Sequence, residues 1–336
     1  MSDAGWTLRR PNGAGVLAFV VAIGRLSRLK FLGGGFVGVG LGTAIAAYEV
    51  GRVDWRAYAV VQFVVTSFQV MTHYANDYFD RRCDVLAERT PYSGGSGVLV
   101  DGALPAAVAL RAAFVAAASG TLGTCVLAAG HRPAAAALAL AIAILAWAYS
   151  APPVRLLARG LGEIDTALIV AVLVPVCAFA AQGAPPDLRL VASTLPGAAA
   201  MLAMMLAVEY PDLTADAAGG KRNLVVRLGG ARARPLGVAF VALAYAALAT
   251  APALGAPPGY VVLGAVSLPA GWSLAWTFSQ RREADRNFDC DLAARGVAFF
   301  FLITFFGLLA YAAAPHRGPR GAVAATFAAP PAVMQA

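Results

Sequence analysis

Long apolar stretches that alternate with short charged segments limit the folds open to this chain more than any other feature. A helix of about 20 apolar residues crosses a bilayer core. The stretches that fit such a helix are residues 31–50, 57–75, 105–130, 134–151, 163–182, 190–209, 235–254, 259–279 and 296–315. Only 13% of the residues are charged, against about 25% in soluble domains. The sequence therefore predicts an all-α, polytopic membrane helix bundle of about nine transmembrane helices.

The distribution of Lys and Arg predicts the orientation of this bundle. Nineteen of these residues lie in the segments on one side of the spans and six on the other. Basic loops stay in the cytoplasm, so we expect a multi-pass protein of the cell inner (cytoplasmic) membrane with a cytoplasmic N-terminus and an outside C-terminus. The net charge of +8 then reflects topology, and we expect the bilayer, and no nucleic acid, as partner. No protein partner is identifiable.

The two ends of the chain differ from its middle. We expect a flexible N-terminal segment over residues 1–24, a membrane domain over 25–315 and a disordered tail over 316–336, which is rich in Pro and Ala. Inside the first span, small residues recur at every fourth position: Gly34, Gly38, Gly42 and Ala46. This spacing predicts a helix face that packs closely against a neighbouring helix.

Three acidic residues follow the second span in the sequence NDYFDRRCD. If the helix continues, Asp77, Asp80 and Asp84 occupy positions i, i+3 and i+7 and fall on one face. Like charges so close together at a membrane boundary are unfavourable. Mg²⁺ relieves such repulsion, and it prefers one or two carboxylates together with phosphate oxygens and water. A solvated helix end is the simpler alternative.

A second acidic segment, EYPDLTADAAGGKR, follows the sixth span. Asp212 and Asp216 are spaced i, i+4, and the Lys/Arg count places them on the same side of the membrane as the first segment. Lys221 and Arg222 follow a Gly-Gly turn and can contact phosphate oxygens, or they can anchor the loop at the membrane surface. Two acidic segments on one side suggest a shared metal-bound anion, with both loops forming a cytoplasmic-side active site.

These two segments resemble the motifs of the UbiA-type intramembrane aromatic prenyltransferases. The pattern N-D-x-x-D-x-x-x-D is matched by Asn76, Asp77, Asp80 and Asp84, and the pattern D-x-x-x-D with a following G-K is matched by Asp212, Asp216, Gly220 and Lys221. The stretches YSAPPVRLLARGLGEI and GKRNLVVRLG are similar to segments of the 1,4-dihydroxy-2-naphthoate polyprenyltransferase branch of menaquinone synthesis. The chain departs from that branch at Glu209, where the branch has Asn.

The resemblance implies a Mg²⁺-dependent transfer of a polyprenyl group from polyprenyl diphosphate to an aromatic acceptor. It implies that five carboxylates hold the Mg²⁺ ions: Asp77, Asp80, Asp84, Asp212 and Asp216. Asn76 would orient these groups, and Lys221 would neutralise the departing diphosphate.

Five further residues have two interpretations each. Arg28 resembles an early diphosphate-binding arginine of the family, or it anchors the first span. Tyr149 stabilises an allylic cation through its ring, or it is an ordinary interfacial aromatic residue. Arg155, like Glu163, either positions the acceptor or ties loops together, and Arg222 either binds the substrate or anchors its loop.

The sequence leaves several questions open. The best candidate acceptor is 1,4-dihydroxy-2-naphthoate, and 4-hydroxybenzoate, homogentisate or a lipid acceptor is the alternative. A membrane transporter is a more distant alternative, since acidic residues also mark ion pathways. Asp285, Asp289 and Asp291 form either a solvated loop or part of a loop that covers the site.

Overall fold

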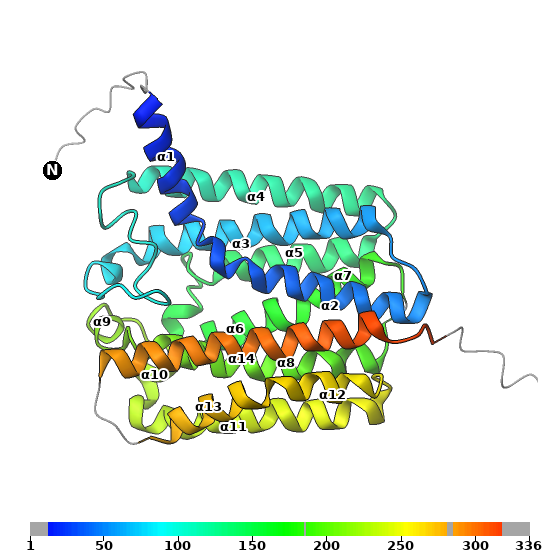
Figure 1. Ribbon diagram of the computed structural model, residues 1–336. Helices are drawn as coiled ribbons and strands as arrows, with labels where there is room; N and C mark the ends of the chain where they lie inside the picture. The colour runs from blue at the N-terminus through cyan, green and yellow to red at the C-terminus, as the bar shows by residue number, and fades with distance from the viewer. Residues whose placement is uncertain (1–12, 185, 281–284, 318–336) are drawn as a thin grey trace, which may run out of the picture.

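The computed structural model describes residues 13–184, 186–280 and 285–317, and every regular element within these ranges is helical (Figure 1). The α-helices are α1 (Gly13–Leu26), α2 (Gly33–Val50), α3 (Trp55–Asp84), α4 (Ala106–Ala129), α5 (Pro133–Ala148), α6 (Gly162–Thr166), α7 (Val174–Ala181), α8 (Leu188–Glu209), α9 (Leu213–Ala218), α10 (Leu224–Leu228), α11 (Gly230–Thr250), α12 (Gly259–Gly264), α13 (Leu268–Ser279) and α14 (Arg286–Ala313). The shorter turns are η1 (Leu29–Phe31), η2 (Leu157–Arg159), the π-helical η3 (Ala167–Leu173), η4 (Ala251–Leu254) and η5 (Ala265–Ser267).

The prediction of an all-α, multi-pass membrane bundle is confirmed. Six helices in the described part of the chain are long and apolar enough to cross a membrane, or seven if the bent pair Gly15–Phe31 and Gly33–Val50 is one span. The helix over Pro133–Ala148 has only 16 residues, and α3 carries Gln62 and Gln69 inside its apolar stretch. The number of nine spans therefore stays a prediction.

The N-terminal segment differs in part from its predicted form. Residues 13–24, which the sequence assigned to a flexible segment, belong to helix α1. The rest of that segment and most of the predicted C-terminal tail lie outside the described residues. Arg28 interrupts the chain between α1 and η1 with a left-handed backbone (φ 46°), and the two parts of the bent pair meet at 47°.

Side-chain caps set the beginnings of two long helices. The Asp54 carboxylate accepts hydrogen bonds from the backbone N–H groups of Arg56 and Ala57 at 3.0 and 3.1 Å, so α3 begins at Trp55. The Asp187 carboxylate accepts from Leu190 N at 3.1 Å at the start of α8. Both caps satisfy N–H groups that have no partner inside the helix, and both helices end at the acidic segments.

The small-residue face of α2 packs as its spacing predicts. Gly34, Gly38, Gly42 and Ala46 are all buried. A Cβ atom added at Gly42 would come within 1.9 Å of the carbonyl oxygen of Pro175, which belongs to α7. Helix α2 therefore lies directly against the backbone of α7, and this contact holds the first half of the bundle together.

The two ends of the bundle differ in chemistry. At the end where α14 begins, the loop of residues 85–105 and helices α9 and α10 gather together (Figure 1); we call this the acidic end. Near the opposite end Arg189 is 1% exposed and pairs with Glu49 at 3.1 Å and Asp187 at 2.7 Å. This buried pairing ties α8 to α2. The two acidic motifs of the sequence lie at the other end of the bundle, at the ends of α3 and α8.

Candidate active site

The first acidic segment forms the last turns of α3, so the helix continues past the apolar stretch as the spacing predicts. Asp77 and Asp80 are buried, at 2% and 4% exposure. Arg28 and the hydroxyl of Ser96 both donate to the Asp77 carboxylate. Asn76 donates to Asp80 at 2.7 Å and accepts from Arg28 at 3.0 Å. Arg28 and Asn76 therefore contact the acidic face directly.

The second acidic segment begins at the end of α8 and continues into α9. Lys221 is 8% exposed, and its Nζ lies 3.2 Å from Asp80 Oδ2 and 3.1 Å from Asp216 Oδ1. Asn223 donates to the other oxygen of Asp216 at 2.9 Å. The structure thus brings the two motifs together around one ammonium group, although they are far apart in the sequence.

The glycine-rich loop that follows the first motif joins both acidic segments. Gly94 N donates to Asp212 Oδ2 at 2.8 Å, while Ser96 binds Asp77. Between them, Gly95 has a left-handed backbone (φ 70°), and a Cβ atom there would lie 2.4 Å from Asp84 Oδ2. Only glycine allows the loop to approach the carboxylates so closely.

Burial sets the electrostatics of the acidic residues. It raises the pKa of Asp84 to about 7 and that of Asp216 to about 6, with Lys221 opposing both increases. Burial also raises the pKa of Asp212. For Lys221, burial disfavours the ammonium form, but Asp80, Asp216 and Asp84 outweigh it and raise the pKa. Lys221 is therefore charged at neutral pH and compensates the carboxylates around it.

A cavity of about 270 Å³ extends from this acidic group into the bundle. Its polar end is formed by six of the predicted site residues: Arg28, Asn76, Asp84, Asp212, Asp216 and Lys221. Its interior is mostly apolar and includes Phe68, Ile142, Val174, Met201 and Phe300. Tyr149 lines the cavity as well. The arrangement suits a ligand with an anionic head and an apolar tail.

Not every predicted site residue reaches the cavity. Arg155 and Arg222 are exposed, and neither lines it. Asp77 and Asp80 lie behind the surface of the cavity, where Arg28 and Lys221 cover them. Glu163 is buried and accepts a hydrogen bond from Leu224 N at 2.5 Å, which ties α6 to α10. Of the two interpretations of Glu163, this contact supports the one in which it joins loops.

The carboxylates fit Mg²⁺ by donor type, although the described residues contain no group of three acidic, His or Cys side chains ready to hold a metal ion. One buried oxygen, Asp212 Oδ1, has no hydrogen-bond partner, and oxygen is the ligand atom that Mg²⁺ prefers. Because Mg²⁺ takes most of its ligands from water and phosphate, two acidic segments that meet around one ammonium group need not form a complete protein cage.

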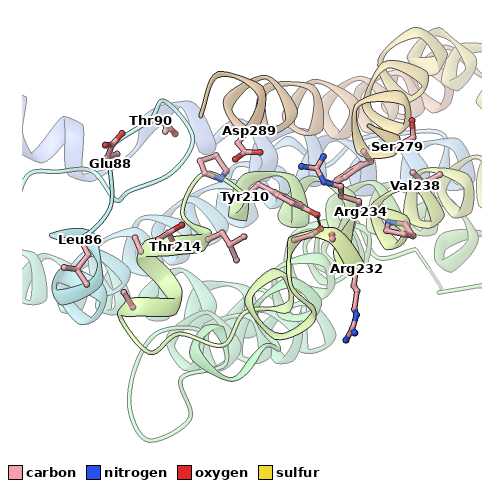
Figure 2. Close-up of a pocket in the computed structure, with 18 residues that line it drawn as sticks. Leu86, Glu88, Thr90, Tyr210, Thr214, Arg232, Arg234, Val238, Ser279 and Asp289 are labelled. Atoms are coloured by element: carbon pink, nitrogen blue, oxygen red, sulfur yellow. Dashed lines mark hydrogen bonds between the residues drawn. The ribbon is translucent and has the colours of Figure 1, made fainter. Parts of the chain in front are cut away.

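A second, wider pocket of about 1330 Å³ lies at the same end of the bundle (Figure 2). Tyr210, Arg234 and Asp289 come together in it, and the Arg234 guanidinium lies 5.2 Å from the centre of the Tyr210 ring. Asp289 is 7% exposed, so it is not part of a solvated loop, whereas the side chain of Asp291 is 70% exposed. Asp285 caps α14. Among the residues that line this pocket, none belongs to the predicted metal site.

Sequence reasoning gave no direct role to several side chains that contact the site. Ser96 binds Asp77, and Asn223 binds Asp216 and caps α10. Asp165 and Glu209 line the cavity below the acidic group. The SGGSG sequence contained a signal for the loop, since consecutive glycines allow close backbone approach. Asp165 carried a weaker signal, as an isolated acid within a few residues of the start of an apolar span.

Comparison with solved structures supports the fold. A structure described as a UbiA homolog from Archaeoglobus fulgidus bound to GPP and Mg²⁺ aligns with a TM-score of 0.62 at 13% identity, covering 85% of this chain and 99% of that one. The same homolog bound to DMAPP and Mg²⁺ gives 0.61 at 13% identity, covering 86% and 99%. A structure from a study of digeranylgeranylglyceryl phosphate synthase gives 0.61 at 14% identity, covering 87% and 98%. The comparison with curated proteins gave no match.

The helical bundle, the paired acidic segments and the apolar cavity define the class of this protein, which is an intramembrane prenyltransferase. The model of the UbiA prenyltransferase family matches residues 36–303, which is most of the chain. The chain therefore belongs to the UbiA prenyltransferase family.

Proposed function

We propose that this protein transfers a polyprenyl group from polyprenyl diphosphate to an aromatic acceptor in a Mg²⁺-dependent reaction. The observation that carries the proposal is the meeting of two acidic segments around Lys221 at the polar end of an apolar cavity. The solved UbiA homolog is described with GPP or DMAPP and Mg²⁺ bound, which is the ligand chemistry that this cavity suits.

Mg²⁺ supplies positive charge that stabilises the diphosphate as it leaves. Five residues would hold it: Asp77, Asp80, Asp84, Asp212 and Asp216. Three of them lie on α3, Asp212 directly precedes α9 and Asp216 lies on α9. Lys221 contacts both segments, so both would be able to hold metal ions at one site. Asn76 holds Asp80 in place through its 2.7 Å hydrogen bond.

The cationic side chains of the site bind the diphosphate. Lys221 is buried and Arg28 is partly buried, and each is paired with a carboxylate. With metal ions bound to the carboxylates, both cations would be able to contact phosphate oxygens instead. Positive charge that is positioned before the reaction lowers the barrier to ionisation, because no reorganisation is needed in the transition state. Arg222 and Arg155 are exposed, and we propose for them contact with a substrate only as it enters.

The apolar interior protects the reactive allylic group. Phe68, Ile142 and Met201 line the cavity, and we expect this apolar lining to exclude water and so to protect the cation from hydrolysis. Tyr149 stands where its ring face can stabilise the positive charge that develops at the allylic carbon. The acceptor ring attacks that carbon, and diphosphate departs.

The sequence supports 1,4-dihydroxy-2-naphthoate as the acceptor, in menaquinone biosynthesis. Two segments, YSAPPVRLLARGLGEI and GKRNLVVRLG, carry this part of the proposal. Glu209 replaces an Asn of that branch, so 4-hydroxybenzoate and homogentisate are the alternative acceptors. The basic loops support a cytoplasmic acidic end in the cell inner membrane.

The test is an assay of the purified protein in lipid nanodiscs with Mg²⁺, a radiolabelled polyprenyl diphosphate and each of the three acceptors. We expect a prenylated product with 1,4-dihydroxy-2-naphthoate, and a loss of about 100-fold or more in Asp80→Asn and Asp212→Asn. Asp291→Asn, which changes an exposed acid on α14, is the matched control. If product forms only from another acceptor, that compound replaces 1,4-dihydroxy-2-naphthoate in the proposal. Full Mg²⁺-dependent turnover in both site variants would refute the assignment of the metal site.

A further inference from the structure

Buried carboxyl oxygens without hydrogen-bond partners occur at and near the wall of the cavity. They belong to Glu163, Asp165 and Glu209, which are 1%, 4% and 6% exposed. One oxygen of Glu163 and both oxygens of Asp165 and Glu209 lack a hydrogen-bond partner among the described residues. A buried carboxyl group without a partner is destabilising, so a concentration of them needs an explanation.

Asp165 is the most isolated of the three. Both of its oxygens are buried and unpartnered, and it lines the cavity. It lies on α6, immediately before the π-helical η3. Single π-helical turns are rare and occur frequently at functional sites. The local backbone thus marks the same position as the unpartnered side chain.

Glu209 lines the cavity from the end of α8. It lies beside Glu163 and the backbone of Val225, yet neither of its oxygens makes a hydrogen bond of standard geometry. Glu163 faces away from the cavity toward Leu224. Asp165 therefore has both oxygens available to a ligand in the cavity, and Glu209 has further acceptor capacity although it lies within hydrogen-bonding reach of Glu163 and Val225.

The cations that line the cavity do not supply the missing partners. Arg28 is paired with Asp77, and Lys221 lies between Asp80 and Asp216. A bound diphosphate would draw both cations further toward itself. A hydrogen-bond donor of another molecule can then use the free acceptor capacity of Asp165 and Glu209, and an O–H group is the donor that an aromatic acceptor carries.

We propose that Asp165 and Glu209 bind the hydroxyl groups of the aromatic acceptor, and that Asp165 takes the phenolic proton during transfer. The inference rests on the proposed function and names the acceptor class for the same cavity. Two carboxyl groups that line one cavity favour an aromatic ring with two hydroxyl groups, of the hydroquinone type, over a ring with one.

The proposed step is balanced in protons and electrons. The phenolic O–H bond breaks, its proton moves to an Asp165 oxygen, and the electron pair enters the ring. The ring carbon forms a bond to the first carbon of the prenyl group, while the bond from that carbon to the diphosphate oxygen breaks and diphosphate keeps the pair. The attacked carbon then loses a proton to diphosphate, or CO₂ if it carries a carboxylate, and Asp165 returns its proton to the ring oxygen.

The experiment separates acceptor binding from the rest of the reaction. Calorimetric titration measures binding of 1,4-dihydroxy-2-naphthoate and its mono-O-methyl ethers to detergent-solubilised protein with Mg²⁺ and a thio-diphosphate analogue that does not ionise. We expect wild-type protein to prefer the free hydroxyl form at least about 10-fold, as for one hydrogen bond to a charged group. In Asp165→Asn the preference for the free hydroxyl compound over one of the two ethers should fall below about 2-fold. The substitution and the O-methylation remove the same contact, so their effects should not add.

Two control variants distinguish the loss of this specific contact from a general structural effect. Asp165→Glu should restore part of the preference, whereas Asp291→Asn should keep all of it. In turnover assays, Asp165→Asn should lower kcat by about 100-fold, the usual contribution of a general base, with Glu209→Gln raising mainly KM. Wild-type affinity for the dihydroxy compound in Asp165→Asn, no preference in wild-type protein, or no binding of any hydroxyaromatic compound would each overturn the inference.

Failure of the proposed function gives a different result. Mg²⁺-dependent binding of the thio-diphosphate analogue is measured first, without acceptor, and it tests the diphosphate site alone. If the analogue does not bind, the proposed function is wrong. If it binds and the hydroxyl preference is absent, only the acceptor inference is wrong.

Discussion

Replacement of Lys221 by Met tests the central contact of the site. The ammonium group lies 3.2 Å from Asp80 and 3.1 Å from Asp216, and all three side chains are at most 10% exposed. At these distances each attraction amounts to about 5 kcal/mol at an effective dielectric constant of about 20, most of which the desolvation of the charges offsets. Removing one partner of a buried ion pair costs about 3–5 kcal/mol, because the remaining charges lose their compensation.

We therefore expect Lys221→Met to lower the Tm in EDTA by about 6–10 °C, at about 2 °C per kcal/mol for a chain of this size. The change in Tm is measured by thermal unfolding in detergent micelles. Mg²⁺ should raise the Tm of the variant more than that of wild-type protein, since the ion replaces the missing positive charge. Arg222→Met removes an exposed charge from the same loop and should leave the Tm unchanged.

Two results would refute this reasoning. One is a Tm of Lys221→Met in EDTA within about 2 °C of the wild-type value, which would show that the pair contributes less than about 1 kcal/mol. The other is an equal effect of Mg²⁺ on both proteins, which would place the metal ion away from the carboxylates that Lys221 compensates.

Three further substitutions test individual contacts. Gly95→Ala places a methyl group 2.4 Å from Asp84 at a positive φ; transfer activity should fall about 10-fold or more as the loop is displaced, and unchanged activity would show that the loop does not close on the carboxylates during turnover. Gly42→Ala forces α2 away from Pro175 and should lower the Tm by several degrees, whereas Gly24→Ala, with open space around it, should not. Asn223→Ala removes the cap of α10 and a hydrogen bond to Asp216; a loss of about 1–2 kcal/mol in stability is expected, and a Tm equal to that of wild-type protein would contradict it.

Much of the fold followed from the sequence because its strongest signals are local. Apolar length determines where membrane helices lie, and the helices found over Ala106–Ala129 and Leu188–Glu209 match the predicted spans within a few residues. The small residues of α2 predicted its packing face, because close helix contact requires them. The acidic motifs predicted one shared site, since the membrane restricts both to one surface.

Other features depend on tertiary contacts that no local pattern encodes. The bend at Arg28 requires a left-handed arginine, which is an uncommon conformation for that residue. The approach of Ser96 to Asp77 depends on the path of a long loop. Asp165 could not be assigned from its spacing, because its surroundings come from several helices. The environment of a polar residue near the end of a span is the hardest to predict from sequence, and the site consists of such residues.

The π-helical stretch Ala167–Leu173 makes the position of Asp165 depend on chain length. A π-helical turn holds one more residue than an α-helical turn, so deleting one residue there would rotate the preceding turn by about 100° relative to the rest of the span. The span would keep its hydropathy and nearly its length, while Asp165 would leave the cavity wall. If Asp165 binds the acceptor as proposed, acceptor choice in this protein would change through a single insertion or deletion, which no scan of substitutions would sample.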